Sequence, residues 1–280
     1  MLAKIISAVV LISLTFSAGL QVDRAHLMAV LKNVPLLLRA LLANFIIVPI
    51  LGVLIAKLLH LNPIVATGFL LMAIAPGVPF VLFGVRKKGG HLGFAVALAA
   101  LLPLLSIVTV PLTAALVLPA TSEARLPLAQ FAMTLVLFQL LPLLIGGIIG
   151  YRLPQLAERL AKPIQWIFFA STLVLLIALV PRIIREVASI YGSLDILASF
   201  LLVILSFLTG WLLGGPAPEN RRVLALGTTL RNIGLCALIA TTNFPESDVI
   251  AAVMTYLLVQ AIVVAIASIV FTRTAQRTVA

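Results

Sequence analysis

Residues 227–234 read Gly-Thr-Thr-Leu-Arg-Asn-Ile-Gly, a polar segment that interrupts the apolar run 223–243 and carries the positive charge of Arg231. A second interruption, Ala75-Pro76-Gly77-Val78-Pro79, lies within the apolar run 64–85. Its two prolines remove backbone donors and its glycine permits bending, so a regular helix cannot continue through it undisturbed. Both interruptions fall in runs about as long as a membrane-spanning helix.

The chain as a whole is apolar enough to require a lipid environment. Of its 280 residues, 63% are hydrophobic and 10% are charged, against about 45–50% and about 25% in soluble domains. Only helices or closed barrels satisfy their backbone hydrogen bonds in lipid. Long continuous apolar runs such as 36–59 and 164–184 differ from the short alternating segments of a barrel. We therefore predict an all-α integral membrane protein without a soluble domain.

Apolar runs of about 20 residues predict about nine membrane spans. Their approximate ranges are 2–20, 35–59, 64–85, 92–118, 128–150, 163–184, 194–213, 223–243 and 247–272. The first run, with Lys4 before it and Ser17-Ala18-Gly19 after it, has a pattern that a cleavable signal peptide would share. Because many further spans follow, we expect a first transmembrane helix instead.

Lysine and arginine residues gather on one side of the nine predicted spans. That side holds Arg24, Lys32, Arg39, Arg86, Lys87, Lys88, Arg152, Arg159, Lys162, Arg221, Arg222, Arg273 and Arg277. The opposite side holds Lys4, Lys57, Arg125, Arg182 and Arg185. Because loops rich in lysine and arginine stay in the cytoplasm, we predict a cell membrane protein with its N-terminus outside and its C-terminus inside.

Several classes of function are disfavoured by the sequence. The net charge of +11 comes from short basic clusters between apolar runs, without aromatic interleaving, so we expect no nucleic-acid partner. A single cysteine, Cys236, excludes an internal disulfide and a cysteine-based metal site. No nucleophile–base pair or metal-ligand cluster lies near a span end. We therefore expect neither an enzyme nor a cofactor.

The two interruptions occupy corresponding places in two predicted repeats, residues 1–120 and 121–280. Each follows a short turn and precedes the last span of its half. Paired breaks of this kind are typical of transporters built from inverted repeats, because the freed N–H and C=O groups can bind ions and substrate at membrane depth. The alternative is a pair of simple kinks, since proline and glycine are common in membrane helices.

Arg231 is the strongest candidate for a functional residue. An arginine at the centre of a transmembrane helix costs about 3 kcal/mol even on the lenient insertion scale. Arg231 follows Arg222, which marks the membrane edge, by about 14 Å of helix. A shifted span with Arg231 at that edge is the alternative. The predicted substrate-binding residues are Arg231, Asn232, Thr228, Thr229, Pro76, Gly77, Val78, Pro79 and Gln260.

These candidates also have structural explanations. Each threonine hydroxyl can instead bond to its own helix backbone. Gln260 can instead make an ordinary interhelical hydrogen bond. The sequence is compatible with both explanations.

The chain resembles the bile acid:sodium symporter family over nearly its whole length. Ala75-Pro76-Gly77 is similar to the family's Cys-Pro-Gly crossover, and residues 231–235 (Arg-Asn-Ile-Gly-Leu) are similar to its Gln-Asn-Ser-Gly-Leu crossover. Residues 19–23, 44–49 and 140–142 resemble further family motifs. The resemblance implies a nine-helix form with a panel domain, made of the first, fifth and sixth spans, and a core domain in which the interrupted helices cross.

The chain departs from the sodium-coupled members where sodium would bind. A Thr-x-Ser-Asn sequence follows their first crossover, but residues 79–82 here read Pro-Phe-Val-Leu, and their glutamate aligns with Gly227. The resemblance therefore implies that the sodium ligands are largely lost. A remnant of the cation site would consist of Asn44, Gly227 and Arg231.

These patterns predict a secondary transporter that moves a small organic anion by alternating access. We hypothesise that the Arg231 guanidinium replaces a sodium ion and donates to crossover carbonyls and to the Asn44 amide oxygen, so sodium coupling is left open. In a competing version Arg231 pairs with the substrate carboxylate. Other interpretations are a sodium-independent efflux carrier of the arsenite or auxin-efflux type and a non-transporting membrane receptor. The sequence fixes neither the substrate nor the oligomeric state.

Overall fold

A computed structural model describes residues 2–22, 28, 33–77, 85, 89–118, 128–188, 192–245 and 248–277. The regular elements within these ranges are all helical. This confirms the all-α prediction.

Seven helical segments of the described chain are long and apolar enough to cross a membrane. They are α1 (Leu2–Leu20), α3–η1–α4 (Val34–Leu42, Ala43–Ile47, Val48–Leu58), α6 (Leu92–Val117), α7–η3–α8 (Leu128–Leu135, Val136–Leu140, Leu141–Arg152), α9 (Pro154–Val187), α10 (Gly192–Leu213) and α13 (Val249–Arg277). Large apolar side chains on their outer faces are exposed, for example Leu116 and Leu212. Such a surface is stable in lipid rather than in water.

Three shorter helices correspond to the two interrupted spans: α5 (Pro63–Ile74), α11 (Pro218–Thr229) and α12 (Ile233–Asn243). The second interrupted span therefore consists of two half-length helices, α11 and α12, joined by an extended link. The first is helical up to Ile74, and most of the remainder lies outside the described residues. The second halves of α5 and α11 and the first eight residues of α12 are buried, as expected for segments enclosed by other helices.

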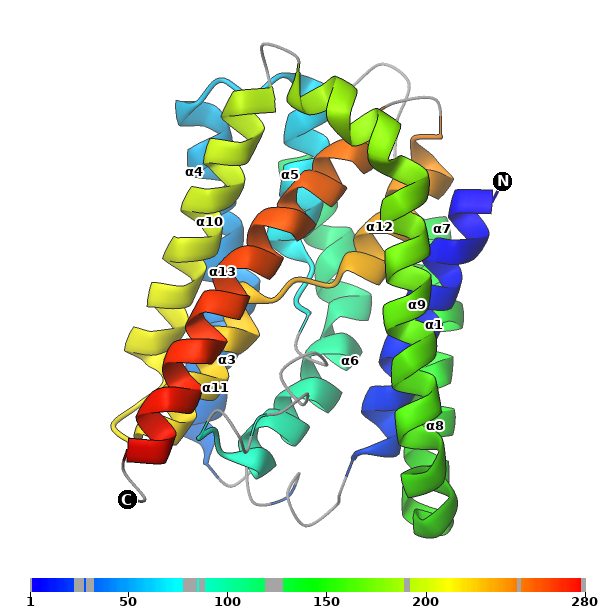
Figure 1. Cartoon of the computed structure of the whole chain (residues 1–280), viewed down its shortest axis with the longest axis vertical. Coiled ribbons are helices and arrows are strands. Elements are labelled where there is room, and N and C mark those ends of the chain that lie inside the picture. The colour runs from blue at the N-terminus through cyan, green and yellow to red at the C-terminus, as the bar shows by residue number, and fades with distance from the viewer. Residues whose placement is uncertain are drawn as a thin grey trace.

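The long helices form two groups around these short ones. On one side α1 packs against both α8 and α9, and we call α1, α7–η3–α8 and α9 the panel group. On the other side α10 packs against α4, α11 and α13 (Figure 1). The panel group contains the first, fifth and sixth predicted spans, as the family resemblance implied. The start of α1 and the end of α13 lie at opposite ends of the bundle (Figure 1).

Two π-helical turns, η1 and η3, interrupt long spans immediately before helices that carry proline at the second position, Pro49 in α4 and Pro142 in α8. Because proline lacks an N–H, the backbone ladder loses a donor there and the turn widens. Each turn places one buried amide side chain in the interior, Asn44 from η1 and Gln139 from η3. Such turns frequently accompany functional sites.

One helix begins well before its predicted span. The sixth span was expected to start at Pro163, but α9 begins at Pro154 and continues through Pro163 to Val187. An interior proline removes a single backbone donor, and membrane helices tolerate this loss where neighbouring groups compensate for it.

Candidate functional site

The two interrupted stretches meet in the middle of the bundle, where the link between α11 and α12 crosses it (Figure 1). The N–H of Gly77 donates to the Leu230 carbonyl, and the N–H of Asn232 donates to the Ala75 carbonyl, each at 3.1 Å. These two bonds pair the stretches in antiparallel fashion. We call residues 75–77 and 230–232 the crossing. It satisfies backbone groups that a broken helix would otherwise leave unpaired at membrane depth.

Gly77 makes this close approach feasible. A Cβ atom at this position would collide with the carbonyl carbon and oxygen of Arg231 and lie 2.5 Å from the Asn232 nitrogen. These are backbone atoms, which cannot move aside as a flexible side chain can. The glycine is therefore needed for the contact between the stretches, whatever its contribution to bending.

The side chain of Arg231 is fully buried in the crossing. Its Nε, Nη1 and Nη2 atoms make no hydrogen bond within the described chain, and the groups that interact with it electrostatically are the Tyr256 hydroxyl and the Cys236 thiol. The backbone N–H of Arg231 donates a 2.7 Å hydrogen bond to Gln260 Oε1. Gln260 therefore holds the crossing through the backbone, from α13.

The hydrogen bond expected from Arg231 to the Asn44 amide oxygen is not made in this structure. Asn44 is fully buried, its Nδ2 donates to the Ala40 carbonyl at 3.0 Å, and its Oδ1 has no hydrogen-bond partner in the described chain. The Arg231 guanidinium, a buried donor, and Asn44 Oδ1, a buried acceptor, therefore both lack a hydrogen bond in the described chain. Each such group requires an explanation, because leaving it unpaired costs about 1–3 kcal/mol.

A network of buried amides links the crossing to the panel group. Asn232 Nδ2 donates to Gln139 Oε1 at 3.0 Å, while Asn232 Oδ1 caps α12 by accepting from the N–H of Leu235 at 3.1 Å. Gln139 Nε2 donates to Ser106 Oγ at 2.6 Å and to the Pro103 carbonyl at 2.7 Å. The network therefore joins η3, α6 and α12 through buried side chains that are hydrogen-bonded to one another.

The other predicted site residues occupy less central positions. The Thr229 hydroxyl donates to the Ala225 carbonyl of its own helix at 2.7 Å. The Thr228 hydroxyl lies 2.8 Å both from the Leu224 carbonyl and from the Ser206 carbonyl of α10. Gly227 is buried within α11. The predicted residues Val78 and Pro79 lie outside the described part of the chain. The structure thus brings together Pro76, Gly77, Arg231, Asn232 and Gln260.

Sequence reasoning missed two residues near the crossing, Gln139 and Tyr256. Gln139 carries a visible signal, since it is a lone amide within an apolar run shortly before Pro142. Tyr256 carries none, because a tyrosine in a membrane helix is expected at the interface. Only the packing of α13 against α12 and α5 places its hydroxyl beside Arg231.

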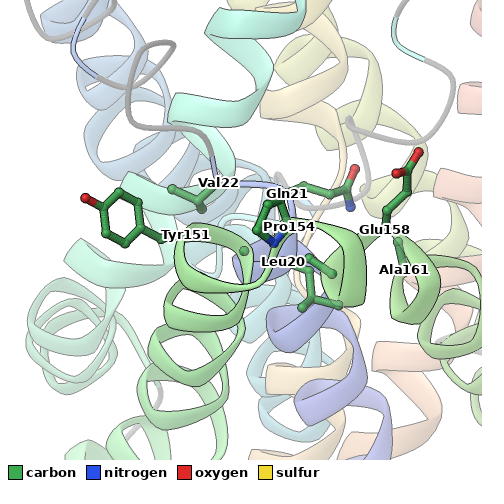
Figure 2. Close-up of a pocket in the computed structure, with 9 residues that line it drawn as sticks. Leu20, Gln21, Val22, Tyr151, Pro154, Glu158 and Ala161 are labelled. Atoms are coloured by element: carbon green, nitrogen blue, oxygen red, sulfur yellow. The ribbon is translucent and has the colours of Figure 1, made fainter.

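A pocket elsewhere in the molecule does not coincide with this site. Figure 2 shows this pocket, of about 510 Å³, where α1 and α8 end and α9 begins, with Gln21 and Glu158 among its lining residues. Gly234, the second residue of α12, lies against Leu11 of α1. Leu20, which lines the pocket, is about 14 Å further along α1. The described residues also contain no group of three or more His, Cys, Asp or Glu side chains that could hold a metal ion.

An all-helical bundle in which a broken helix, α11–α12, crosses the chain that leaves α5 has the architecture of a secondary transporter. The comparison with known families agrees: residues 8–189 match the model of the Sodium Bile acid symporter family, and the chain belongs to that family. Members of this family are transporters rather than enzymes. The match includes Asn44, the first interruption and Gln139, and it ends before α10, so the second interruption lies beyond it. No curated protein matches the chain.

Proposed function

We propose that this chain moves a small organic anion across the cell membrane by alternating access, without the sodium sites of the sodium-coupled members. The single observation that carries the proposal is the crossing itself, where two interrupted stretches meet beside a fully buried arginine whose guanidinium makes no hydrogen bond to the described residues. Family membership supports a transporter. The family match does not favour the alternatives of an arsenite- or auxin-efflux type carrier and a non-transporting receptor.

The charge of the crossing supports an anionic substrate. Arg231 stays protonated in proteins, and its electrostatic neighbours Tyr256 and Cys236 are neutral when protonated. In a low-dielectric interior a fixed positive charge repels a cation far more strongly than it would in water. The amino end of α12 starts beside the same point, where Asn232 caps it, so the unpaired guanidinium donors of Arg231 are the groups that an anion would meet. A substrate that reaches the crossing is therefore expected to be negatively charged.

The side chains around the crossing support the loss of sodium coupling. A sodium site in a broken helix needs several free oxygen atoms. The Asn232 side-chain oxygen already accepts from the N–H of Leu235, and the Thr228 and Thr229 hydroxyls donate to backbone carbonyls of α10 and α11. Gly227 offers no side-chain ligand. Among the side chains of the expected cation-site remnant, Asn44 Oδ1 is the one oxygen atom that has no hydrogen-bond partner in the described chain.

Alternating access requires two groups of helices that move relative to each other around the site. The panel group contacts the crossing mainly through α1, which packs along α12, and through the hydrogen bond between Gln139 and Asn232. A single hydrogen bond can break and reform during a rigid-body movement, and packed helices such as α1 and α12 can slide along each other. We propose that the panel group and the remaining helices are the two moving parts.

The proposal is tested by uptake into liposomes that contain the purified protein. A panel of radiolabelled carboxylates and sulfonates is supplied with either a sodium or a choline gradient, and empty liposomes serve as the control. We expect accumulation of at least one anion at equal rates in the two gradients. Uptake that requires sodium contradicts the sodium-independent proposal, and saturable binding without accumulation identifies a receptor instead.

A further inference from the structure

We propose that the crossing is a cation site that the protein fills from within, with the Arg231 guanidinium as a permanent, tethered occupant. Removing that side chain then creates a site for a free monovalent cation, guanidinium in preference to sodium. The inference concerns the cation coupling of the proposed transporter, and it rests on the proposed function for its consequence in transport. That Arg231 occupies the cation site follows from the helix ends at the crossing and from the contacts of Arg231.

The carboxyl ends of two helices meet at the crossing. α5 ends at Ile74 and α11 ends at Thr229, and the chains that leave them pair with each other directly. Each helix end carries about half a negative charge on carbonyls that lack intrahelical donors. Two such ends together present about one negative charge to the same small volume. That arrangement favours one monovalent cation.

The guanidinium of Arg231 lies beside one of these ends. It interacts electrostatically with the Cys236 thiol, and that thiol lies 3.3 Å from the Leu71 carbonyl, in the last turn of α5. The backbone of Arg231 follows the end of α11 directly and is held by Gln260. The backbone of Arg231 therefore lies between the ends of α5 and α11, and its guanidinium is buried in the same region without a hydrogen bond to their carbonyls in the described chain.

The amino end of α12 also starts at the crossing, but its own donors are largely satisfied. Asn232 Oδ1 accepts from the N–H of Leu235, the Asn232 carbonyl accepts from the N–H of Cys236, and the Arg231 carbonyl accepts from the N–H of Ile233. A capped helix start exposes less of its positive partial charge. The two carboxyl ends therefore dominate the electrostatics at Arg231.

Within the described chain, the groups that interact electrostatically with Arg231 include no carboxylate. Asp195 is the fully buried carboxylate of the described chain, and it lies in the first turn of α10. The contact between α10 and Thr228 is made by Ser206, further along that helix. A buried cation needs a compensating negative charge. The helix ends are the negative groups that the crossing provides, which explains how Arg231 is tolerated without an acidic partner.

The test measures the thermal unfolding temperature, Tm, of purified Arg231→Ala. We expect a lower Tm than that of the wild type, and a saturable rise of about 5 °C with millimolar guanidinium or methylguanidinium. Choline at the same ionic strength should give no rise. The wild type and Arg159→Ala, a variant of an exposed arginine, should not respond to guanidinium. The unfolding experiment needs no substrate. Its outcome therefore does not depend on whether the protein transports an anion, and the two proposals can be refuted separately.

Three results would overturn the inference: an Arg231→Ala protein as stable as the wild type, a variant without a cation-specific rise, or a wild type stabilised by guanidinium to the same extent. Should Arg231→Ala not be recovered, Arg231→Met and Arg231→Lys are compared by fluorescence-detected size-exclusion chromatography of membrane extracts. The inference requires Arg231→Lys to fold in plain buffer and Arg231→Met to be recovered only with guanidinium. Equal recovery of the two variants contradicts it.

Discussion

Asn232 Nδ2 donates a 3.0 Å hydrogen bond to Gln139 Oε1, which joins the start of α12 to the π-helical turn η3 of the panel group. Both side chains are fully buried, and Gln139 is anchored in turn to Ser106 and Pro103 of α6. An amide that loses such a partner in the interior costs about 1–3 kcal/mol. This bond therefore stabilises the contact between the panel group and the crossing in the conformation described by the structure.

We expect Gln139→Leu to lower the stability of the protein by about 1–3 kcal/mol, because it leaves the Asn232 amide without an acceptor. Asn232→Ser keeps a capping oxygen for α12 but removes the donor to Gln139. If the two side chains act through their mutual bond, the double variant is less destabilised than the sum of the single variants by about 0.5–3 kcal/mol. Thermal unfolding in detergent gives the three values.

The control for that cycle is Gln21→Leu. Gln21 is partly buried and its Nε2 donates within its own helix, to the Ser17 carbonyl. Gln21→Leu should change the stability little, and its effect should add to that of Asn232→Ser. Additive effects for the pair of Gln139 and Asn232 would instead show that their hydrogen bond contributes nothing to the folded state.

Gly77→Ala should disrupt the crossing, because the added methyl group collides with backbone atoms of Arg231. We expect a loss of at least about 2 kcal/mol of stability, within the range of overpacked interiors, and loss of transport. Gly147→Ala is the matched control, since the nearest atom to its Cβ would be the Gly19 oxygen at 4.0 Å. Equal stability and uptake for the two variants would contradict the close approach at Gly77.

The two threonines of α11 are expected to differ. Thr229→Val removes a hydroxyl that bonds only within its own helix, so stability and KM should stay near wild-type values. Thr228→Val removes a bond to the Ser206 carbonyl of α10, and interhelical bonds in membranes average about 0.6 kcal/mol. A many-fold rise in KM for Thr229→Val would show instead that substrate recruits this hydroxyl.

The positions of the two breaks could be predicted from the sequence because proline and glycine act locally. Pro76 and Gly77 end a helix wherever they occur in an apolar run, and a buried charge such as Arg231 stands out against its neighbours. Their contact with each other was expected only through the family resemblance. Backbone pairing between distant segments depends on the packing of every helix in between.

The partners within the site could not be predicted in the same way. Arg231 was expected to reach Asn44, but its side chain lies beside Tyr256 and Cys236. The direction of a long side chain depends on the rotation of α12 against α13, which no local pattern encodes. The role of Gln139 depends on the π-helical turn before Pro142, which turns a single amide toward α12. The start predicted at Pro163 rests on the tendency of proline to begin or end a helix. In the structure α9 continues through Pro163 although this residue lacks a backbone donor.

The predicted sidedness can be tested with single cysteines, since Cys236 is buried and is the sole native cysteine. In a Cys236→Ala background, Glu158→Cys and Asp248→Cys place thiols at exposed positions on opposite predicted sides. Both changes leave the lysine and arginine distribution intact, and that distribution sets orientation. We expect an impermeant maleimide to label Asp248→Cys on intact cells and Glu158→Cys only after permeabilisation. The reverse pattern would invert the orientation, and labelling of both on intact cells would indicate insertion in both directions.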